Sequence, residues 1–198
     1  MRLVIASGNP GKLREIGQML APLGIEVLPQ EDFGVPECPE PYFTFIENCL
    51  AKARHAALHT GLPALADDSG ICAHALNGAP GVFSARYAGE PKSDQRNNEK
   101  LVAALAGQTD RRAHYYCVMV LVRHAEDPEP LIAEGRWQGE IIATPRGDGG
   151  FGYDPYFLVP ALGKTGAELS AAEKNALSHR GQALRDLVAK LRATPALD

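Results

Sequence analysis

The sequence predicts an α/β fold with a mixed central β-sheet flanked by helices. Short apolar runs alternate with amphipathic segments in the N-terminal part of the chain, which is typical of strands joined by helices. Strand-like segments then predominate between residues 63 and 143, and the chain ends in a helical segment. With 198 residues, of which 45% are hydrophobic, the chain is long enough to bury a substantial core.

The N-terminal third is expected to contain two strands and two helices. Apolar side chains recur at helical spacing after Lys12 and again after Thr44, and a glycine suited to end each helix follows at Gly24 and Gly61. The three prolines in 31–43 predict a loop. The expected elements are a strand at 2–7, a helix from 12 to 24, a strand at 25–29, the loop at 31–43 and a helix at 44–61.

The middle of the chain is expected to supply most of the strands. The pattern in 63–76 predicts a strand, a sharp turn at Ser69 and Gly70, and a second strand. Segment 113–123 is apolar for most of its length, which predicts a strand covered on both faces. The other expected elements are a turn at 77–81, a helix at 93–107 capped by Ser93, one or two strands at 130–143, a glycine-rich loop at 144–157 that leads into a short strand, and a helical end at 170–193 with a Ser170–Glu173 capping box and a second cap at Ser178.

Composition and charge exclude several classes of protein. A formal net charge of -4, without a basic stripe, argues against a constitutive nucleic-acid binder but leaves room for a local basic pocket. The N-terminus turns polar too soon for a signal peptide, and no stretch approaches the roughly 18 apolar residues of a membrane helix. The four cysteines are widely spaced, which favours reduced thiols in a cytoplasmic protein. We expect a soluble protein with one domain or two lobes that share a cleft.

The segment SGNPGK at 7–12 is a candidate for binding an anion. A strand leads through a glycine-containing turn into a helix, whose exposed backbone N–H groups and dipole favour a phosphate. It is not a Walker A loop, because the interval between Gly8 and Gly11 is too short and Leu13 replaces the serine or threonine that would hold magnesium. An ordinary strand-to-helix turn explains this segment equally well. The candidate residues are Ser7, Gly8, Asn9, Pro10, Gly11 and Lys12.

Two adjacent carboxylates, Asp67 and Asp68, interrupt a run of small apolar residues. Ionised carboxylates are rarely buried unless they are paired, hydrogen-bonded or bound to a metal. Strand alternation places the two side chains on opposite faces, which predicts different roles. One could hold a divalent cation or act as a base toward water, and a structural turn capped by an aspartate is the alternative. Upstream, Glu47 and Lys52 alone indicate no more than a solvated helix flank.

Two further segments could recognise a nucleotide base. The loop at 147–157 combines glycines with Asp154, and Phe151 and Tyr153 offer flat faces for stacking, although an aromatic loop tucked into the core is the alternative. Basic donors that could reach a carbonyl or phosphate oxygen follow at an expected helix junction, where solvated surface is the alternative. They are Lys174, His179 and Arg180. Together with the turn and the carboxylates, these groups describe a nucleoside triphosphate site.

Six motifs run nearly from end to end of the chain. They are SGNPGKLREI (7–16), TFIENCLAKA (44–53), ADDSG (66–70), GAPGVFSARYAG (78–89), GGFGYDPYF (149–157) and AELSAAEKNALSHRGQAL (167–184). In this order and spacing the sequence resembles the inosine triphosphate pyrophosphatase family, the dITP/XTP pyrophosphatases that clear non-standard purine nucleotides. The resemblance implies a single ITPase-like domain over 1–198, with two lobes and the active site in the cleft between them. It also implies a magnesium-dependent homodimer that hydrolyses dITP, ITP or XTP to the monophosphate and pyrophosphate.

The resemblance also assigns roles to individual residues. Asp68 matches the acid that binds metal and activates water, and Ser69 beside it is implied to contact substrate. A second metal-binding acid is expected upstream, where Glu40 is the nearest match to the family pattern and Glu37 and Glu47 are alternatives. The triphosphate is implied to lie against Ser7 to Lys12 and Lys52, and the base and sugar against Phe151, Gly152, Tyr153, Asp154, Lys174, His179 and Arg180.

Two other functions compete with this prediction. A nucleotide sensor could keep the pocket without hydrolysis, but the intact acid and lysines argue against it. A related pyrophosphatase could act on modified pyrimidine nucleotides, but the segments FGYD and SHR favour a purine. The donors of Arg180 are expected to favour a 6-keto purine over adenine, because adenine presents an amino donor at the same position.

Overall fold

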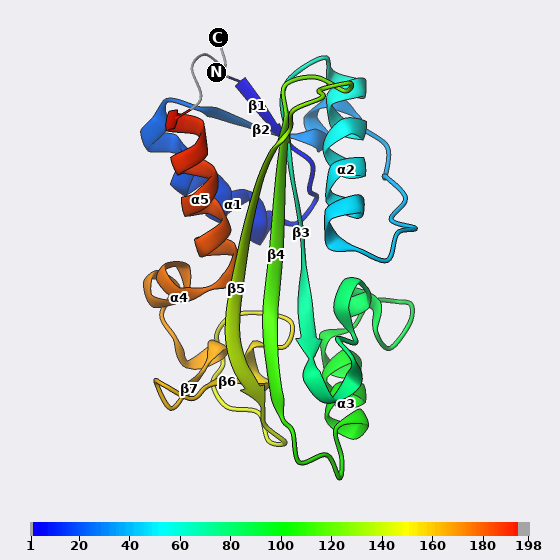
Figure 1. The fold of residues 1–198 in the computed structure, drawn as a ribbon, viewed down its shortest axis with the longest axis vertical. Helices are drawn as coiled ribbons and strands as arrows, with labels where there is room; N and C mark the ends of the chain where they lie inside the picture. The colour runs from blue at the N-terminus through cyan, green and yellow to red at the C-terminus, as the bar shows by residue number, and fades with distance from the viewer. Residues whose placement is uncertain (1, 194–198) are drawn as a thin grey trace. The chain divides into compact units, whose positions relative to one another are not determined.

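The computed structural model describes residues 2–193 and contains a seven-stranded mixed sheet (Figure 1). The strand order is β2-β1-β3-β4-β5-β6-β7, in which β1 pairs in parallel with β2 and β3, whereas β6 pairs antiparallel with β5 and β7. The sheet and its helices confirm the predicted fold class. The strands are β1 (Arg2–Ile5), β2 (Glu26–Pro29), β3 (Ala64–Ala73), β4 (Arg112–Val122), β5 (Leu131–Ile141), β6 (Phe157–Val159) and β7 (Lys164–Thr165); the helices are α1 (Pro10–Leu20), α2 (Phe45–Thr60), α3 (Asp94–Ala104), α4 (Ala171–Leu177) and α5 (His179–Ala193).

The chain forms two compact units. Of the described residues, the first unit contains 2–68, 117–134 and 182–193, and the second contains 69–116 and 135–181. Strands β3, β4 and β5 and helix α5 therefore contribute residues to both units. Within residues 2–193 no helix is long and apolar enough to cross a membrane. Whether the two units share a cleft stays a prediction.

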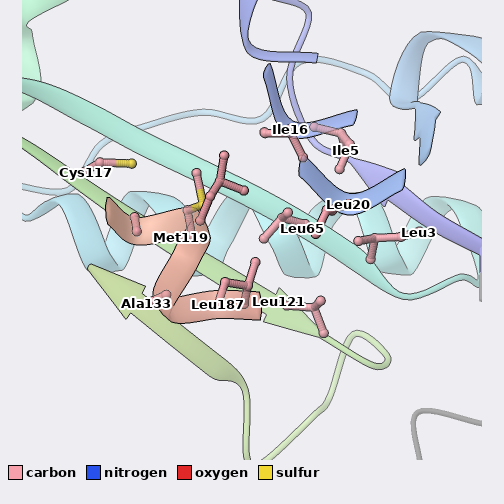
Figure 2. Packing of buried hydrophobic residues seen from close by; sticks show 12 residues of the cluster. Leu3, Ile5, Ile16, Leu20, Leu65, Cys117, Met119, Leu121, Ala133 and Leu187 are labelled. Carbon is pink, nitrogen blue, oxygen red and sulfur yellow. The ribbon is translucent and has the colours of Figure 1, made fainter. Parts of the chain in front are cut away.

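The first unit has one apolar core beneath α1 and α5 (Figure 2). Alternate residues of the strands point to this face, as strand geometry requires, and Ile16 and Leu20 of α1 meet them together with Leu187 of α5. Because these side chains are fully buried, truncating one leucine to alanine would cost about 2–5 kcal/mol of unfolding free energy. The strand residues in this cluster are Leu3, Ile5, Leu65, Cys117, Met119, Leu121 and Ala133.

Helix α2 covers the other face of the same strands (Figure 1). Its buried residues are small, with Ala53 and Ala56 fully enclosed, so the helix can approach the sheet closely. The Cys49 Sγ lies 3.3 Å from the carbonyl oxygens of both Ala66 and Val118, either of which can accept its single S–H. Leu65 of β3 belongs to the core beneath α1, so the side chain of the next residue, Ala66, points to the opposite face, which α2 covers.

The second unit has its own aromatic core. The ring of Tyr115 lies 4.7 Å from that of Phe157 and 6.1 Å from that of Trp137, measured between centroids. Leu101 and Leu105 bring α3 into the same cluster. The remaining buried members are Ile71, Ala73, Ala113, Ile141, Tyr153, Val159 and Leu169.

Local signals in the sequence located several helix caps, but α1 starts at Pro10 and not at Lys12, α3 ends before Gly107, and one turn prediction is wrong. Gly24 and Gly61 adopt left-handed backbone conformations at φ 69° and 66°, and the Ser170–Glu173 capping box is present. By contrast, β3 runs without interruption through Ser69 and Gly70. The backbone N–H of Ile71 donates a hydrogen bond to Ser84 Oγ at 2.9 Å. A side chain that is distant in sequence thus satisfies the backbone donor next to Gly70, and no turn is required for this.

Candidate active site

In the predicted anion-binding turn, the side chain of Asn9 already occupies the first backbone N–H groups of the helix. Asn9 is the N-cap of α1, and its Oδ1 accepts from the N–H groups of Gly11 at 2.9 Å and Lys12 at 3.2 Å. Pro10, at the first helical position, has no N–H to offer. The expectation that the first amides of this helix are exposed is therefore wrong in this state, and a phosphate would have to displace the Asn9 side chain to reach them.

Both glycines of this turn lie against neighbouring side chains. A Cβ atom on Gly8 would lie 2.9 Å from Glu31 Oε1, and one on Gly11 would lie 3.1 Å from Asn9 Oδ1. Ser7 Oγ completes the turn by accepting from the N–H of Asn9 at 3.2 Å. A side chain at either position would therefore require Glu31 or Asn9 to shift.

Lys12 forms an ion pair with the first of the two adjacent aspartates. Its Nζ lies 2.8 Å from Asp67 Oδ1, and the Asp67 side chain is fully buried. The Cys117 Sγ lies 4.0 Å from the other carboxylate oxygen. Asp67 thus points to the α1 face of β3, and Asp68 points to the α2 face, which confirms that the pair divides between the two faces.

Lys52 lies between Asp68 and Glu40. Its Nζ is 3.1 Å from Asp68 Oδ1 and 2.7 Å from Glu40 Oε1. Burial raises the pKa of Asp68 above its usual value, against the lowering effect of the Lys52 charge. Burial lowers the pKa of Lys52, but the charges of Asp68 and Glu40 outweigh this effect and the pKa is raised overall. Lys52 is therefore part of a partly buried charged cluster, and the interpretation of this residue as a solvated helix flank is wrong.

The two carboxylates are suitable ligands for a magnesium ion. Asp68 Oδ2 is buried and has no hydrogen-bond partner in the described part of the chain. Residues 2–193 contain no group of three or more His, Cys, Asp or Glu side chains placed to hold a metal. Two carboxylates are nevertheless the usual protein contribution to a Mg²⁺ site, because this ion keeps water ligands and binds substrate phosphates. The residues present therefore fit the implied metal.

The loop that carries Glu40 is fixed to α2 by a buried asparagine. Asn48 Oδ1 accepts from the Tyr42 N–H, and Asn48 Nδ2 donates to the Tyr42 carbonyl, both at 3.1 Å. Of the two alternative acids, Glu47 accepts from Thr44 Oγ1 at the helix N-terminus, and Glu37 is exposed. The pairing with Lys52 favours Glu40 as the second acid, and its binding of metal stays a prediction.

In the second unit, a buried carboxylate organises the glycine-rich loop. Asp154 accepts from Lys174 Nζ at 2.6 Å, from the Phe151 N–H at 2.9 Å and from the Tyr115 hydroxyl at 3.3 Å. Phe151 is 45% exposed, and Lys174 Nζ lies 4.5 Å from the centroid of its ring. Tyr153, by contrast, is buried and donates its hydroxyl to the Ser84 carbonyl at 2.7 Å. The prediction that the Tyr153 ring offers a stacking face is wrong, because that ring is part of the core.

Helix α3 holds the same loop through residues that the sequence interpretation missed. The Gly152 N–H donates to Asp94 Oδ2, and Asn98 Nδ2 donates to the Gly152 carbonyl, both at 2.8 Å. Asn98 is buried on a helix, where an asparagine needs partners. The adjacent asparagines at 97 and 98, within an otherwise amphipathic segment, are the signal that could have located this contact.

Of the basic residues predicted at the α4–α5 junction, His179 and Arg180 are buried and Lys174 is partly buried, so the solvated alternative is wrong. The His179 ring stacks on Tyr115 with centroids 4.7 Å apart and planes at 6°. Arg180 Nη2 donates to Ser69 Oγ at 3.1 Å. Ser178 caps α5, as predicted, by accepting from the Gly181 N–H at 3.2 Å. In the second unit the structure thus links Ser69 to Arg180, and Asp154 to Lys174.

Known proteins are similar to this chain over the site residues of both units. A protein of Ralstonia nicotianae named dITP/XTP pyrophosphatase is 69% identical over 194 residues, 96% of each chain, and one of Nitrosomonas europaea with the same name is 68% identical over 190 residues, 96% of this chain and 94% of that one. The HAM1 protein of Coxiella burnetii has a similar structure, with a TM-score of 0.94 and 51% identity over 98% of this chain and 100% of that chain. The Ham1 protein of Staphylococcus aureus gives a TM-score of 0.89 at 41% identity over 98% and 99% of the two chains.

The similarity includes every candidate site residue. The model of the Ham1 family matches residues 3–190, and the candidate residues extend from Ser7 to Arg180. The family model agrees with the two bacterial relatives and with the two similar solved structures. The chain belongs to the Ham1 family.

Proposed function

We propose that this protein hydrolyses the triphosphates of deaminated purines, dITP or ITP and XTP or dXTP, to the nucleoside monophosphate and pyrophosphate. This activity would remove such nucleotides from the pool. The cluster of Asp68, Lys52 and Glu40 carries the proposal, because it combines a buried acid that has an unpartnered oxygen with a cation suited to a phosphate. The names of the bacterial relatives support the same reaction.

Magnesium is the proposed cofactor, with Asp68 and Glu40 as its protein ligands. When bound, Mg²⁺ neutralises negative charge that develops on the phosphates. Lys12 and Lys52 are proposed to contribute in the same way to the pyrophosphate leaving group. In the ligand-free protein Lys52 is paired with Asp68 and would exchange this carboxylate for phosphate oxygens, whereas Lys12 would keep its pairing with Asp67.

Asp68 is proposed to accept the proton of the attacking water. The water oxygen forms a bond to the α-phosphorus, the bond from the α-phosphorus to the bridging oxygen breaks, and the electron pair leaves with pyrophosphate. Asp68 Oδ2 is buried and has no hydrogen-bond partner within residues 2–193, and it is the oxygen proposed to take this proton. Asp67 is proposed to contribute indirectly, by holding Lys12 in place.

The base and sugar are proposed to bind against the second unit. Phe151 offers an exposed ring for stacking, and the buried Arg180 and His179 supply donors in fixed orientations. A donor aimed at position 6 of a purine pairs with the keto oxygen of hypoxanthine or xanthine and opposes the amino group of adenine. We propose that Lys174 and Ser69 complete this binding surface.

A substrate panel tests the proposed function. Pyrophosphate release is measured from dITP, XTP, dGTP, dATP and dTTP, each with Mg²⁺ and with a chelator. We expect metal-dependent release from dITP and XTP. Release from dATP should be slower by about 100-fold or more, because its 6-amino group opposes a buried donor. Release from dTTP should also be slower, because its single ring does not fill a site for a purine. Equal release from all five would contradict the proposed specificity. Binding of dITP without release would favour a nucleotide sensor.

We also propose that the protein is a cytoplasmic homodimer. Four free cysteines support a reducing compartment. The dimer is proposed from the family resemblance alone. Its mass in solution, measured by sedimentation, would decide between one and two chains.

A further inference from the structure

The single ammonium group of Lys52 contacts both proposed metal ligands and offsets part of their negative charge. Its Nζ lies within 3.1 Å of both carboxylates, and its side chain is only 13% exposed. Two carboxylates held this close would repel each other without a cation at the same place. In the ligand-free protein that cation is Lys52, a residue of the chain itself.

The oxygens that Lys52 contacts belong to the groups proposed to bind metal. Asp68 Oδ1 and Glu40 Oε1 each accept from Lys52 Nζ, and they cannot offer the same lone pairs to a second cation. An ammonium and a divalent ion at this distance from the same carboxylates would also repel each other strongly in a partly buried site. Either the metal binds weakly or Lys52 moves away from the carboxylates.

We propose that Lys52 is an internal counter-cation that competes with the metal for Asp68 and Glu40. Release of the ammonium from these carboxylates frees it for the triphosphate, so metal and nucleotide each strengthen the binding of the other through this one side chain. Such coupling is reciprocal by thermodynamic necessity. The inference rests on the proposed function and adds that the nucleotide-free protein holds its metal weakly because of Lys52.

The experiment measures Mn²⁺ binding to the nucleotide-free full-length chain by electron paramagnetic resonance. We expect Lys52→Met to bind Mn²⁺ about tenfold more tightly than the wild type, and Lys52→Arg to bind it about as weakly as the wild type. Lys12→Met is the matched control. It removes the same charge from the same unit, but its Nζ contacts Asp67, so its affinity for Mn²⁺ should change less than about threefold.

The melting temperature is the second measurement, and it detects any loss of stability in the Lys52 variants. If the two carboxylates repel each other in Lys52→Met, the variant melts at a lower temperature, and Mn²⁺ should raise its melting temperature more than that of the wild type. Lys52→Gln provides a polar replacement with the same expectation.

Two results would overturn the inference: unchanged or weaker Mn²⁺ affinity in Lys52→Met, including no binding in either protein, or equal tightening in Lys12→Met. Failure of the proposed function would show differently, as absence of pyrophosphate release by the wild type supplied with metal and dITP.

Discussion

Replacement of Asp68 by asparagine is expected to lower kcat for pyrophosphate release from dITP by about 10³-fold. The amide keeps the shape of the side chain but cannot take a proton from water, and it is a poorer ligand for a divalent ion. Lys52 keeps its contact with Glu40, so the cluster should hold together and the variant should fold. Single-turnover rates at saturating Mg²⁺, together with a thermal melt, measure both effects.

Asp67→Asn is the matched control, because it makes the same change one residue earlier on the opposite face of β3. Asp67 contacts Lys12, so its loss should raise KM by about tenfold and leave kcat within about threefold of the wild type. If Asp68→Asn kept more than about a tenth of kcat, or if both variants lost activity equally, the assignment of the base would be wrong.

Replacement of Asp154 by alanine is expected to destabilise the protein by about 3 kcal/mol, because it removes one partner of a buried ion pair. The change also deprives the Phe151 N–H and the Tyr115 hydroxyl of their acceptor. For a chain of this size the melting temperature should fall by roughly 6–12 °C. Thermal unfolding followed by circular dichroism gives this value directly.

Asp148→Ala provides the control for this prediction. Asp148 lies in the same loop and carries the same charge, but it is exposed, so its loss should change stability by less than about 0.5 kcal/mol. A similar melting temperature for both variants would show that Asp154 does not organise the loop.

The features that could be predicted from the sequence depend on neighbours within a few residues. Helix caps are of this kind: Ser93, Ser170 and Ser178 each accept from an N–H three residues later. The alternation that separates Asp67 from Asp68 depends only on strand geometry. These signals were sufficient for the order of the helices and for the choice of the candidate segments, but not for β3, which was predicted as two strands.

The remaining features depend on contacts that are distant in sequence. Strand β3 is held at Ile71 by a hydrogen bond to Ser84. The buried Tyr153 hydroxyl also bonds to Ser84, which is 69 positions from Tyr153 in sequence. The partners of Lys52 were not predictable either, because Glu40 reaches it on a loop whose path is set by the buried Asn48. Local patterns carry no information about such pairings.

The proposed reaction requires that water attacks the α-phosphorus of a deaminated-purine triphosphate. This step is tested by hydrolysis of dITP in ¹⁸O-labelled water with Mg²⁺, followed by mass spectrometry of both products. We expect the label to appear in dIMP and pyrophosphate to remain unlabelled, because the new bond forms at the α-phosphorus. Label in pyrophosphate, or release of orthophosphate in its place, would contradict it.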